Sequence, residues 1–205
     1  FITNDQTLIF NGTAGAGDIV TVKLNGVTLG TATANGAGVW SYDYTGTTIA
    51  NGTYTLAAST TDIAGNTATA SQAITIDTNA PGQNGDGTAP AITSITNDSG
   101  TAGDFITNDQ TLIFNGTAGA GDVVTVKLDG VTLGTATANG AGVWSYDYTG
   151  TTIANGTYTL AASTTDIAGN TATASQALTI NTVASGAPVI TSISSDSGVP
   201  GDFIT

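Results

Sequence analysis

The chain of 205 residues contains no cysteine, histidine, arginine, methionine or glutamate. Without histidine or cysteine it can form no Ser-His-Asp triad, no cysteine nucleophile and no ordinary zinc site. It can form no disulfide either, so an extracellular fold of this sequence needs another source of stability. The only basic residues are Lys23 and Lys127, which is too little positive charge for nucleic-acid binding.

Long apolar runs and targeting signals are missing as well. No apolar run approaches the roughly 18 residues of a membrane span, and no signal peptide precedes the first turn. We therefore expect no membrane insertion by this segment. The chain is strongly acidic: all 15 acidic residues are aspartates, and the formal net charge is −13. An aspartate-rich surface suits hard cations with oxygen ligands, above all calcium.

The sequence repeats itself. Residues 1–76 align with residues 105–180 with only three changes, Ile19/Val123, Asn25/Asp129 and Ile74/Leu178. A looser repeat relates 90–107 to 188–205, so the first copy lacks its opening segment and the tail opens a third copy. The near-identity predicts a long array, of which this chain is expected to be a piece. We divide it into a first repeat at 1–80, a linker at 81–90, a second repeat at 91–182, and a linker with the opening strand of a third repeat at 183–205.

Apolar and polar residues alternate within each repeat, which is the period of a β-strand. Trp40, Tyr42 and Tyr44, for example, fall on one face of their segment, and no window shows a helical period. In the second repeat we predict strands at 91–96, 110–116, 123–128, 131–138, 143–148, 157–165 and 171–180. The prediction is an all-β chain of tandem immunoglobulin-like β-sandwich domains, about seven strands each, joined end to end.

Several segments resemble the bacterial Ig-like repeats of giant surface adhesins, the RTX-type and biofilm-associated proteins exported by type I secretion. These segments are GTAGAG at 12–17, NGVTLGTA at 25–32, GVW at 38–40, TDIAGN at 61–66 and DTNAP at 77–81. The resemblance implies an extracellular spacer on the bacterial cell surface, rigidified by calcium at its junctions, that holds a distal binding domain away from the cell. The segment that follows the last strand of the second repeat departs from the pattern, because Asn181 stands where the first repeat has Asp77.

Successive strands of a repeat run in opposite directions, so its loops lie at one or the other end of the sandwich. We call these two ends the N-terminal and C-terminal poles. In the second repeat the N-terminal pole is predicted to hold the loops 117–122, 138–142 and 166–170, and the C-terminal pole the loops 97–109, 129–130 and 149–156. In a head-to-tail array the C-terminal pole of one repeat faces the N-terminal pole of the next. We therefore expect the first junction to gather candidate calcium ligands, namely Asp77, Asp86 and Asp166, with Asp122 as a further ligand.

A second candidate calcium site is the glycine-rich loop 97–109, which contains Asp98, Asp104 and Asp109. A bound dication would turn the repulsion among three like charges into attraction. Asp62 holds in the first repeat the place that Asp166 holds in the second, but it faces the free pole, so we expect an emptier site there. The alternative is that these are solvated turn residues, a role in which aspartate is common.

Two classes of function remain after these exclusions. A structural extender of a surface adhesin is favoured by the repeats and the aspartate clusters. The alternative is a module that itself binds a glycan, ice or another cell, through an exposed aromatic residue or a flat threonine face such as the pairs Thr31/Thr33 and Thr67/Thr69. Trp40 and Trp144 are predicted to be core residues instead. An enzyme is not expected, because aspartates in loops at the ends of a sandwich have no defined cleft.

The missing opening segment leads to one more expectation. Without its first strand the first repeat should present an open sheet edge and an unfilled row of the core. The tail 188–205 has the sequence of that strand. We therefore predict that the tail of one molecule fills the gap in another, head to tail. The expected partners of the chain are thus neighbouring repeats and further copies of itself.

Overall fold

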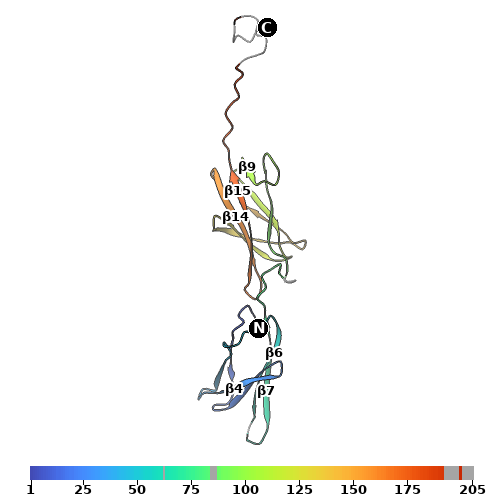
Figure 1. Cartoon of the computed structure of the whole chain (residues 1–205), viewed down its shortest axis with the longest axis vertical. Helices are drawn as coiled ribbons and strands as arrows, with labels where there is room; N and C mark the ends of the chain where they lie inside the picture. Colours follow the sequence, from blue (N-terminus) through green and yellow to red (C-terminus); the bar gives the residue numbers. More distant parts are fainter. Residues whose placement is uncertain (62, 84–86, 192–198, 200–205) are drawn as a thin grey trace.

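The computed structural model describes residues 1–61, 63–83, 87–191 and 199, and every regular element in it is a β-strand. Asp62 and Asp86, two of the candidate ligands, lie outside the described residues. The strands form two separate sandwiches that follow one another along the long axis of the molecule (Figure 1). The predicted fold class, tandem immunoglobulin-like β-sandwiches, is confirmed. Within the described residues no helix is long and apolar enough to cross a membrane.

The second repeat is a complete sandwich of two sheets. One sheet has the strand order β13-β10-β8, and the other has the order β12-β11-β14-β15-β9. The strands are β8 (Ala91–Ile95), β9 (Ile106–Thr107), β10 (Ile113–Thr117), β11 (Val123–Leu128), β12 (Val131–Thr137), β13 (Val143–Asp147), β14 (Gly156–Thr165) and β15 (Thr171–Ile180). All seven predicted strands are present.

Two details of the second repeat differ from the sequence prediction. The alternation missed β9, a two-residue strand that pairs in parallel with the end of β15. It also began β10 at residue 110, whereas the strand begins at Ile113. The reason is local: the N–H and the hydroxyl of Thr111 both donate to Oδ1 of Asp109, at 2.8 and 2.9 Å, which folds this stretch into a turn.

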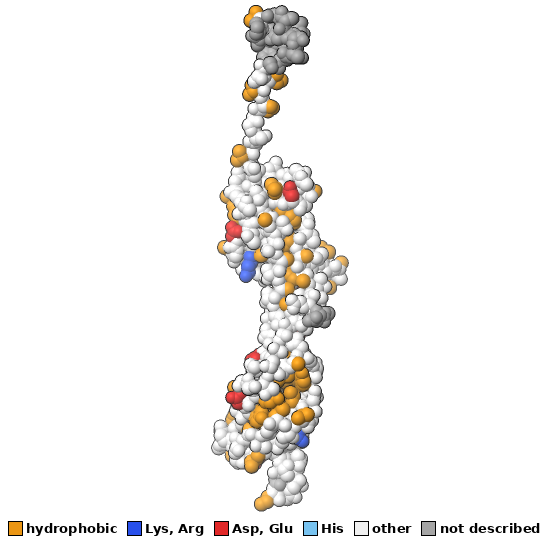
Figure 2. Space-filling model, viewed as in Figure 1, with side chains coloured by type: hydrophobic (Ala, Val, Ile, Leu, Met, Phe, Trp, Pro, Cys, Tyr) orange, Lys and Arg blue, Asp and Glu red, His pale blue; other side chains and the backbone are white. Residues whose placement is uncertain are grey.

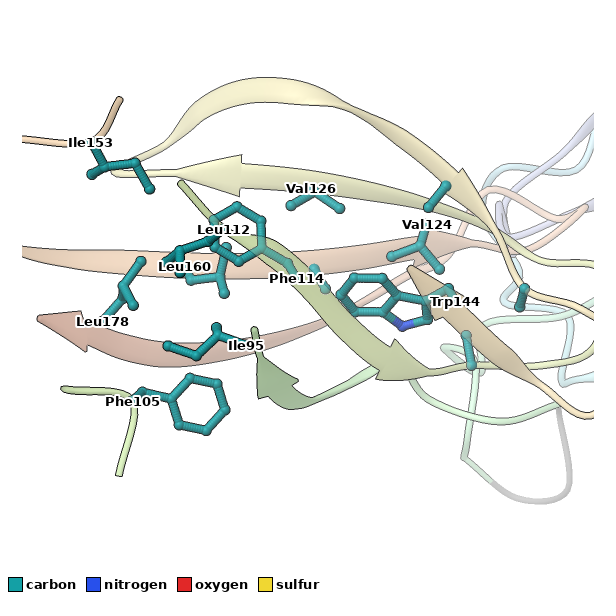
Figure 3. Packing of buried hydrophobic residues seen from close by; sticks show 14 of the residues in the cluster. Ile95, Phe105, Leu112, Phe114, Val124, Val126, Trp144, Ile153, Leu160 and Leu178 are labelled. Carbon is teal, nitrogen blue, oxygen red and sulfur yellow. The ribbon is translucent and has the colours of Figure 1, made fainter. Parts of the chain in front are cut away.

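The core of the second repeat lies between its two sheets. Phe114, Leu160 and Leu178 are completely buried, and Trp144 is 1 % exposed. Figure 3 shows Ile95, from β8, beside Phe105 on one side of this core. The Nε1 atom of Trp144 donates to the carbonyl of Thr117 at 3.1 Å, so the buried indole has a hydrogen-bond partner. The predicted core role of the tryptophan is confirmed.

The first repeat repeats this arrangement without the strand that corresponds to β8. Its five-stranded sheet has the order β1-β7-β6-β3-β4, but its second sheet consists of β2 and β5 alone. The strands are β1 (Ile2–Thr3), β2 (Ile9–Thr13), β3 (Ile19–Leu24), β4 (Val27–Thr33), β5 (Val39–Asp43), β6 (Gly52–Thr61) and β7 (Thr67–Ile76). Among the described residues β2 has one strand partner, so its other edge is open, as the sequence predicts.

The open edge leaves the core of the first repeat partly uncovered. Leu56 and Ala58 of β6 are half-buried, whereas the equivalent Leu160 and Ala162 of β14 are completely buried. The sequences of these two strands are identical, so the difference in burial comes from the presence or absence of the covering strand. Less apolar area is removed from water in the first repeat, which lowers its stability.

The matched substitutions Leu160→Ala and Leu56→Ala test this difference. Leu160→Ala is expected to lower the free energy of unfolding of the second repeat by about 2–5 kcal/mol, because it empties a closed core. Leu56→Ala should cost the first repeat clearly less, since that side chain already contacts water. Denaturant unfolding followed by the fluorescence of Trp144 or Trp40, with the other tryptophan replaced by Phe, measures each cost. Equal costs would contradict an open core in the first repeat.

Candidate functional site

The loop 166–170 at the N-terminal pole of the second repeat is a tight hairpin turn between β14 and β15. The carboxylate of Asp166 closes it: Oδ1 accepts from the backbone N–H of Asn170 and Oδ2 from the side-chain amide of Asn170, each at 2.9 Å. Gly169 has a φ of +97°, a conformation that L side chains rarely adopt. Asp166, Gly169 and Asn170 are therefore explained first as turn residues.

This loop also makes contact with the first repeat. The Nδ2 atom of Asn170 donates to the carbonyl oxygen of Asp77 at 2.8 Å as well as to Asp166. Gly169 lies against Asn4, because a Cβ atom built on it would be 3.4 Å from Nδ2 of Asn4. The C-terminal pole of the first repeat thus faces the N-terminal pole of the second, and the junction brings Asp77 and Asp166 to one amide group.

The sequence Asp-Ile-Ala-Gly-Asn also occurs in the first repeat, where no other part of the described chain lies against residues 63–66 as the first repeat lies against the loop 166–170. Ala64 is exposed there, whereas Ala168 in the second repeat is 8 % exposed. A Cβ atom on Gly65 would meet no atom within 4 Å, in contrast to Gly169. Identical sequences therefore have different surroundings, and the neighbouring repeat accounts for the difference.

The linker between the repeats folds back on itself. Pro81 and Pro90 are both buried, and the N–H of Gln83 donates to the carbonyl of Ala80 at 3.0 Å. Gly82 and Ala89 touch so closely that a Cβ atom on Gly82 would be 2.6 Å from the nitrogen of Ala89. Asp122, the other predicted ligand of the junction, is half-buried and closes its own turn by accepting from the N–H of Gly119 at 3.0 Å.

The loop between β8 and β10 forms the second aspartate cluster, at the C-terminal pole of the second repeat. Oδ2 of Asp109 accepts from the side-chain amide of Asn97 at 2.6 Å, and Oδ1 of Asp104 accepts from the N–H of Ile106 at 2.9 Å. Asn97 and Phe105 have φ angles of +50° and +59°, so the loop holds two residues in left-handed conformations.

Asp98 differs from the other aspartates of this loop. Its Oδ2 accepts from the N–H of Gly103 at 2.7 Å, but its Oδ1 is buried without a hydrogen-bond partner in the structure. A buried carboxylate oxygen without a partner is costly, and it is satisfied by a donor or by a cation. Asp98 therefore offers a buried free oxygen that a calcium ion would satisfy, and the backbone carbonyls of the glycine-rich turn are further oxygen donors.

The structure brings some of the predicted ligand residues near one another. The backbone carbonyl of Asp77 and the carboxylate of Asp166 accept from one amide at the junction, and Asp98, Asp104 and Asp109 share one loop. Within the part of the chain that the structure describes, no three acidic side chains converge closely enough to form a metal site by themselves. Asn170, whose amide joins the repeats, is not among the predicted ligands, because its neutral side chain carries no sign of that role in the sequence.

Two electrostatic effects distinguish the aspartates of the second repeat. Burial raises the pKa of Asp166, but hydrogen bonds from Asn170, Gly169 and Ala168 outweigh it and hold the pKa below its ordinary value. The hydrogen bonds from Asn97 and Thr111 likewise lower the pKa of Asp109. Both groups are therefore carboxylates at neutral pH, which is the form that binds calcium.

Comparison with known families decides what these repeats are. The bacterial Ig-like domain family matches residues 1–78 and 88–182. The chain belongs to the bacterial Ig-like domain family. Its two matches fall on the two sandwiches.

Solved structures with a similar fold include repeats of bacterial adhesins. One is a Ca²⁺-stabilized adhesin that helps an Antarctic bacterium reach out and bind ice, at 28 % identity and a TM-score of 0.46 over 86 % of this chain and 44 % of that one. Another is a 1.5-MDa bacterial ice-binding adhesin, at 24 % identity and a TM-score of 0.43 over 85 % of this chain and 57 % of that one.

A third similar structure contains the fibronectin(III)-like modules of Clostridium thermocellum CbhA, at 12 % identity and a TM-score of 0.50 over 88 % of this chain and 87 % of that one. The chain thus spans about half the length of the two adhesin structures. The comparison with curated proteins finds no match.

The lowered pKa values predict a loss of stability in acid. Asp109 and Asp166 have folded-state pKa values below the unfolded value of about 3.9, so the unfolded chain binds more protons as the pH falls. Their contribution is fully present above about pH 5 and is lost as the pH falls through the folded-state values. Denaturant unfolding between pH 6 and pH 2.5, with carboxylate NMR shifts of Asp166, measures this.

The variant Asp166→Asn should remove part of the acid dependence of the second repeat. The matched variant Asp62→Asn, in the identical loop of the first repeat, should leave the second repeat unchanged. A carboxylate of Asp166 that titrates at or above its ordinary value would contradict the hydrogen-bonding account.

Proposed function

We propose that this chain is a segment of the extender region of a bacterial cell-surface adhesin, with calcium as the ion that stiffens it. The observation that carries the proposal is the pole-to-pole contact of Asn170 with Asp77, which stacks two nearly identical repeats along one axis. A repeated sandwich stacked in this way adds length with every copy. The neighbouring repeats are then its first partners.

Calcium would act at two places. At the C-terminal pole, Asp98 with Asp104 and Asp109 would hold it, and the unpartnered Oδ1 of Asp98 supports this choice. At the junction, the ligands would be Asp77 and Asp166, with Asp86 and Asp122 as further ligands. Asp62, the counterpart of Asp166, would hold calcium in the same way at the junction with a preceding repeat. When bound, the ion supplies positive charge and oxygen coordination that tie separate loops together.

The extracellular surface and type I secretion belong to the same proposal. The absence of cysteine means that the chain uses no disulfides, and calcium is then the remaining means of cross-linking its loops. Two of the similar solved structures are adhesins by name, one of them Ca²⁺-stabilized, and both are longer than this chain. A distal domain elsewhere in the natural protein would carry the receptor specificity.

A second candidate function rests on one face of the sheets. Hydroxyl side chains form a row across four strands of the second repeat, because the register pairs Thr135 with Thr125, Thr125 with Ser163 and Ser163 with Thr173. The same row recurs in the first repeat as Thr31, Thr21, Ser59 and Thr69. Such a flat face would suit ice or a glycan. Retention of the chain in growing ice or on a glycan array would favour this function over the extender.

Calcium is expected to raise the melting temperature of the chain. By mass action, calcium at about 100 times its dissociation constant stabilises the folded state by about 2.7 kcal/mol. Calorimetric scans in calcium and in chelator measure the shift. Asp98→Asn should reduce it, whereas Asp147→Asn, on an exposed strand position at the outer surface, should not. Equal melting temperatures in calcium and chelator, with no heat of calcium binding, would overturn the proposed role of the ion.

A further inference from the structure

We propose that Asn25 is a site of spontaneous covalent modification, at which the side chain cyclises onto the backbone nitrogen of Gly26 and is converted to aspartate or isoaspartate. The site is the hairpin turn between β3 and β4, and the reaction depends neither on calcium nor on the extender function. Three observations support it: the sequence of this turn, the small number of bonds that hold its side chain, and the equivalent turn of the second repeat, which has aspartate at this position.

The turn is a two-residue loop between Leu24 and Val27, which pair with each other across the two strands. Asn25 and Gly26 have φ angles of +49° and +80°, the left-handed conformations that an Asn-Gly hairpin turn adopts. Asn25 is exposed, and a Cβ atom built on Gly26 would meet no atom within 4 Å. The turn therefore projects into open space, and glycine leaves the nitrogen that follows Asn25 unshielded by a side chain.

The reaction needs only the residues of the turn and water. The backbone nitrogen of Gly26 attacks Cγ of Asn25, an N–Cγ bond forms, and the side-chain amide leaves as ammonia with the proton that the attacking nitrogen loses. Water then opens the five-membered succinimide: addition at Cγ gives aspartate, and addition at the backbone carbonyl carbon gives isoaspartate. Because both reacting groups belong to adjacent residues, the cyclisation is intramolecular and needs no second molecule to approach.

The second repeat shows that the turn accepts an aspartate. Asn25/Asp129 is one of the three changes between the aligned repeats. Oδ1 of Asn25 accepts from the N–H of Thr55 at 2.7 Å, and Oδ1 of Asp129 accepts from the N–H of Thr159 at the same distance. The φ angle of Asp129 is +47°, close to that of Asn25. Aspartate at 25 therefore keeps the turn, whereas isoaspartate adds an atom to the backbone of a loop whose length sets the strand register.

Four other asparagines that precede a glycine are held more firmly. Cyclisation must turn the side-chain carbonyl away from its hydrogen-bond donors, and Oδ1 of Asn25 has one such donor among the described residues. Oδ1 of Asn35 accepts from two backbone N–H groups of its own loop, and Asn139 repeats this arrangement. Asn51 and Asn155 each accept from the N–H and the hydroxyl of a threonine. Asn25 therefore gives up fewer bonds to its side-chain oxygen than any of these four.

The remaining described Asn-Gly pairs lie within strands. Asn11 is in β2 and Asn115 in β10, where pairing with the neighbouring strand keeps the backbone extended. A Cβ atom on the glycine after either asparagine would collide with the indole ring of a core tryptophan, so these glycines have no room to move. The pair at 84–85 lies outside the described residues. Among the described pairs, the turn at Asn25 is thus the least restrained.

The modification would add charge to a surface that carries little. Charged residues make up 8 % of the chain, and on the face that Figure 2 shows the acidic side chains are scattered singly among uncharged ones. Each event adds one negative charge to the formal net charge of −13. In its aspartate form, the turn of the first repeat then carries the same charge as the turn of the second.

Incubation of the full chain at mildly alkaline pH, with samples taken over several weeks, tests the proposal. Cleavage after Lys23 and Lys127, the only lysines, puts Asn35 and Asn139 on different fragments, so mass spectrometry assigns each change to its own repeat. Asn25 is expected to convert several-fold faster than Asn35, Asn139 and the other described Asn-Gly pairs, because fewer bonds restrain it. Electron-transfer fragmentation distinguishes the aspartate from the isoaspartate product.

Two controls separate the structure of the turn from its sequence. In concentrated guanidinium chloride, which unfolds the chain, the Asn-Gly pairs differ only in their flanking residues, so the excess at Asn25 should disappear. Asn25→Gln, whose cyclisation would require a larger ring, should form no early product at this position. The proposal is overturned if Asn25 converts no faster than Asn35 and Asn139 in the folded chain, if the same excess persists in guanidinium chloride, or if Asn25→Gln reacts as fast as the unchanged chain.

Discussion

The amide of Asn170 links the two repeats directly by a hydrogen bond. It donates to the carbonyl of Asp77 in the preceding repeat and to the carboxylate of Asp166 in its own loop, at 2.8 and 2.9 Å. The first bond joins the two poles that strand direction turns toward each other, and the second holds the amide in the orientation that the first requires. The burial of Ala168 and the approach of Asn4 to Gly169 occur at the same junction.

The covering strand β8 plays the corresponding role within a repeat. Because the chain contains nearly the same sequence with and without this strand, the structure separates the effect of the strand from the effect of the sequence. Leu160 is completely buried under it, and Leu56 without it is half-buried. The same comparison holds at the N-terminal poles, since Ala168 is buried beside the first repeat whereas the equivalent Ala64 is exposed. In an array, stability therefore resides partly in contacts between copies.

Most of the fold could be read from the sequence, because alternation of apolar residues and near-identity of the repeats are strong signals. Strands such as Val123–Leu128 and Thr171–Ile180 were predictable to the residue. Strand β9 was not, since two residues carry no period, and the start of β10 was displaced by the turn that Asp109 forms. Strand direction alone predicted that the end of the first repeat at Asp77 faces the loop of Asp166. The hydrogen bond of Asn170 to Asp77 could not be predicted from the sequence, because it depends on how the two poles meet in space.

The central claim is that the contact of Asn170 with Asp77 makes the two repeats one stiff unit. Spin labels on Ser41→Cys and Ser145→Cys, equivalent exposed positions in the two repeats, report it through their distance distribution by pulsed electron paramagnetic resonance. In calcium, and with the labelled chain diluted in unlabelled chain to suppress signals between molecules, we predict a single narrow distribution that Asn170→Ala broadens and the matched Asn66→Ala does not. A broad distribution in the chain with Asn170 intact, unchanged by Asn170→Ala, would contradict the account.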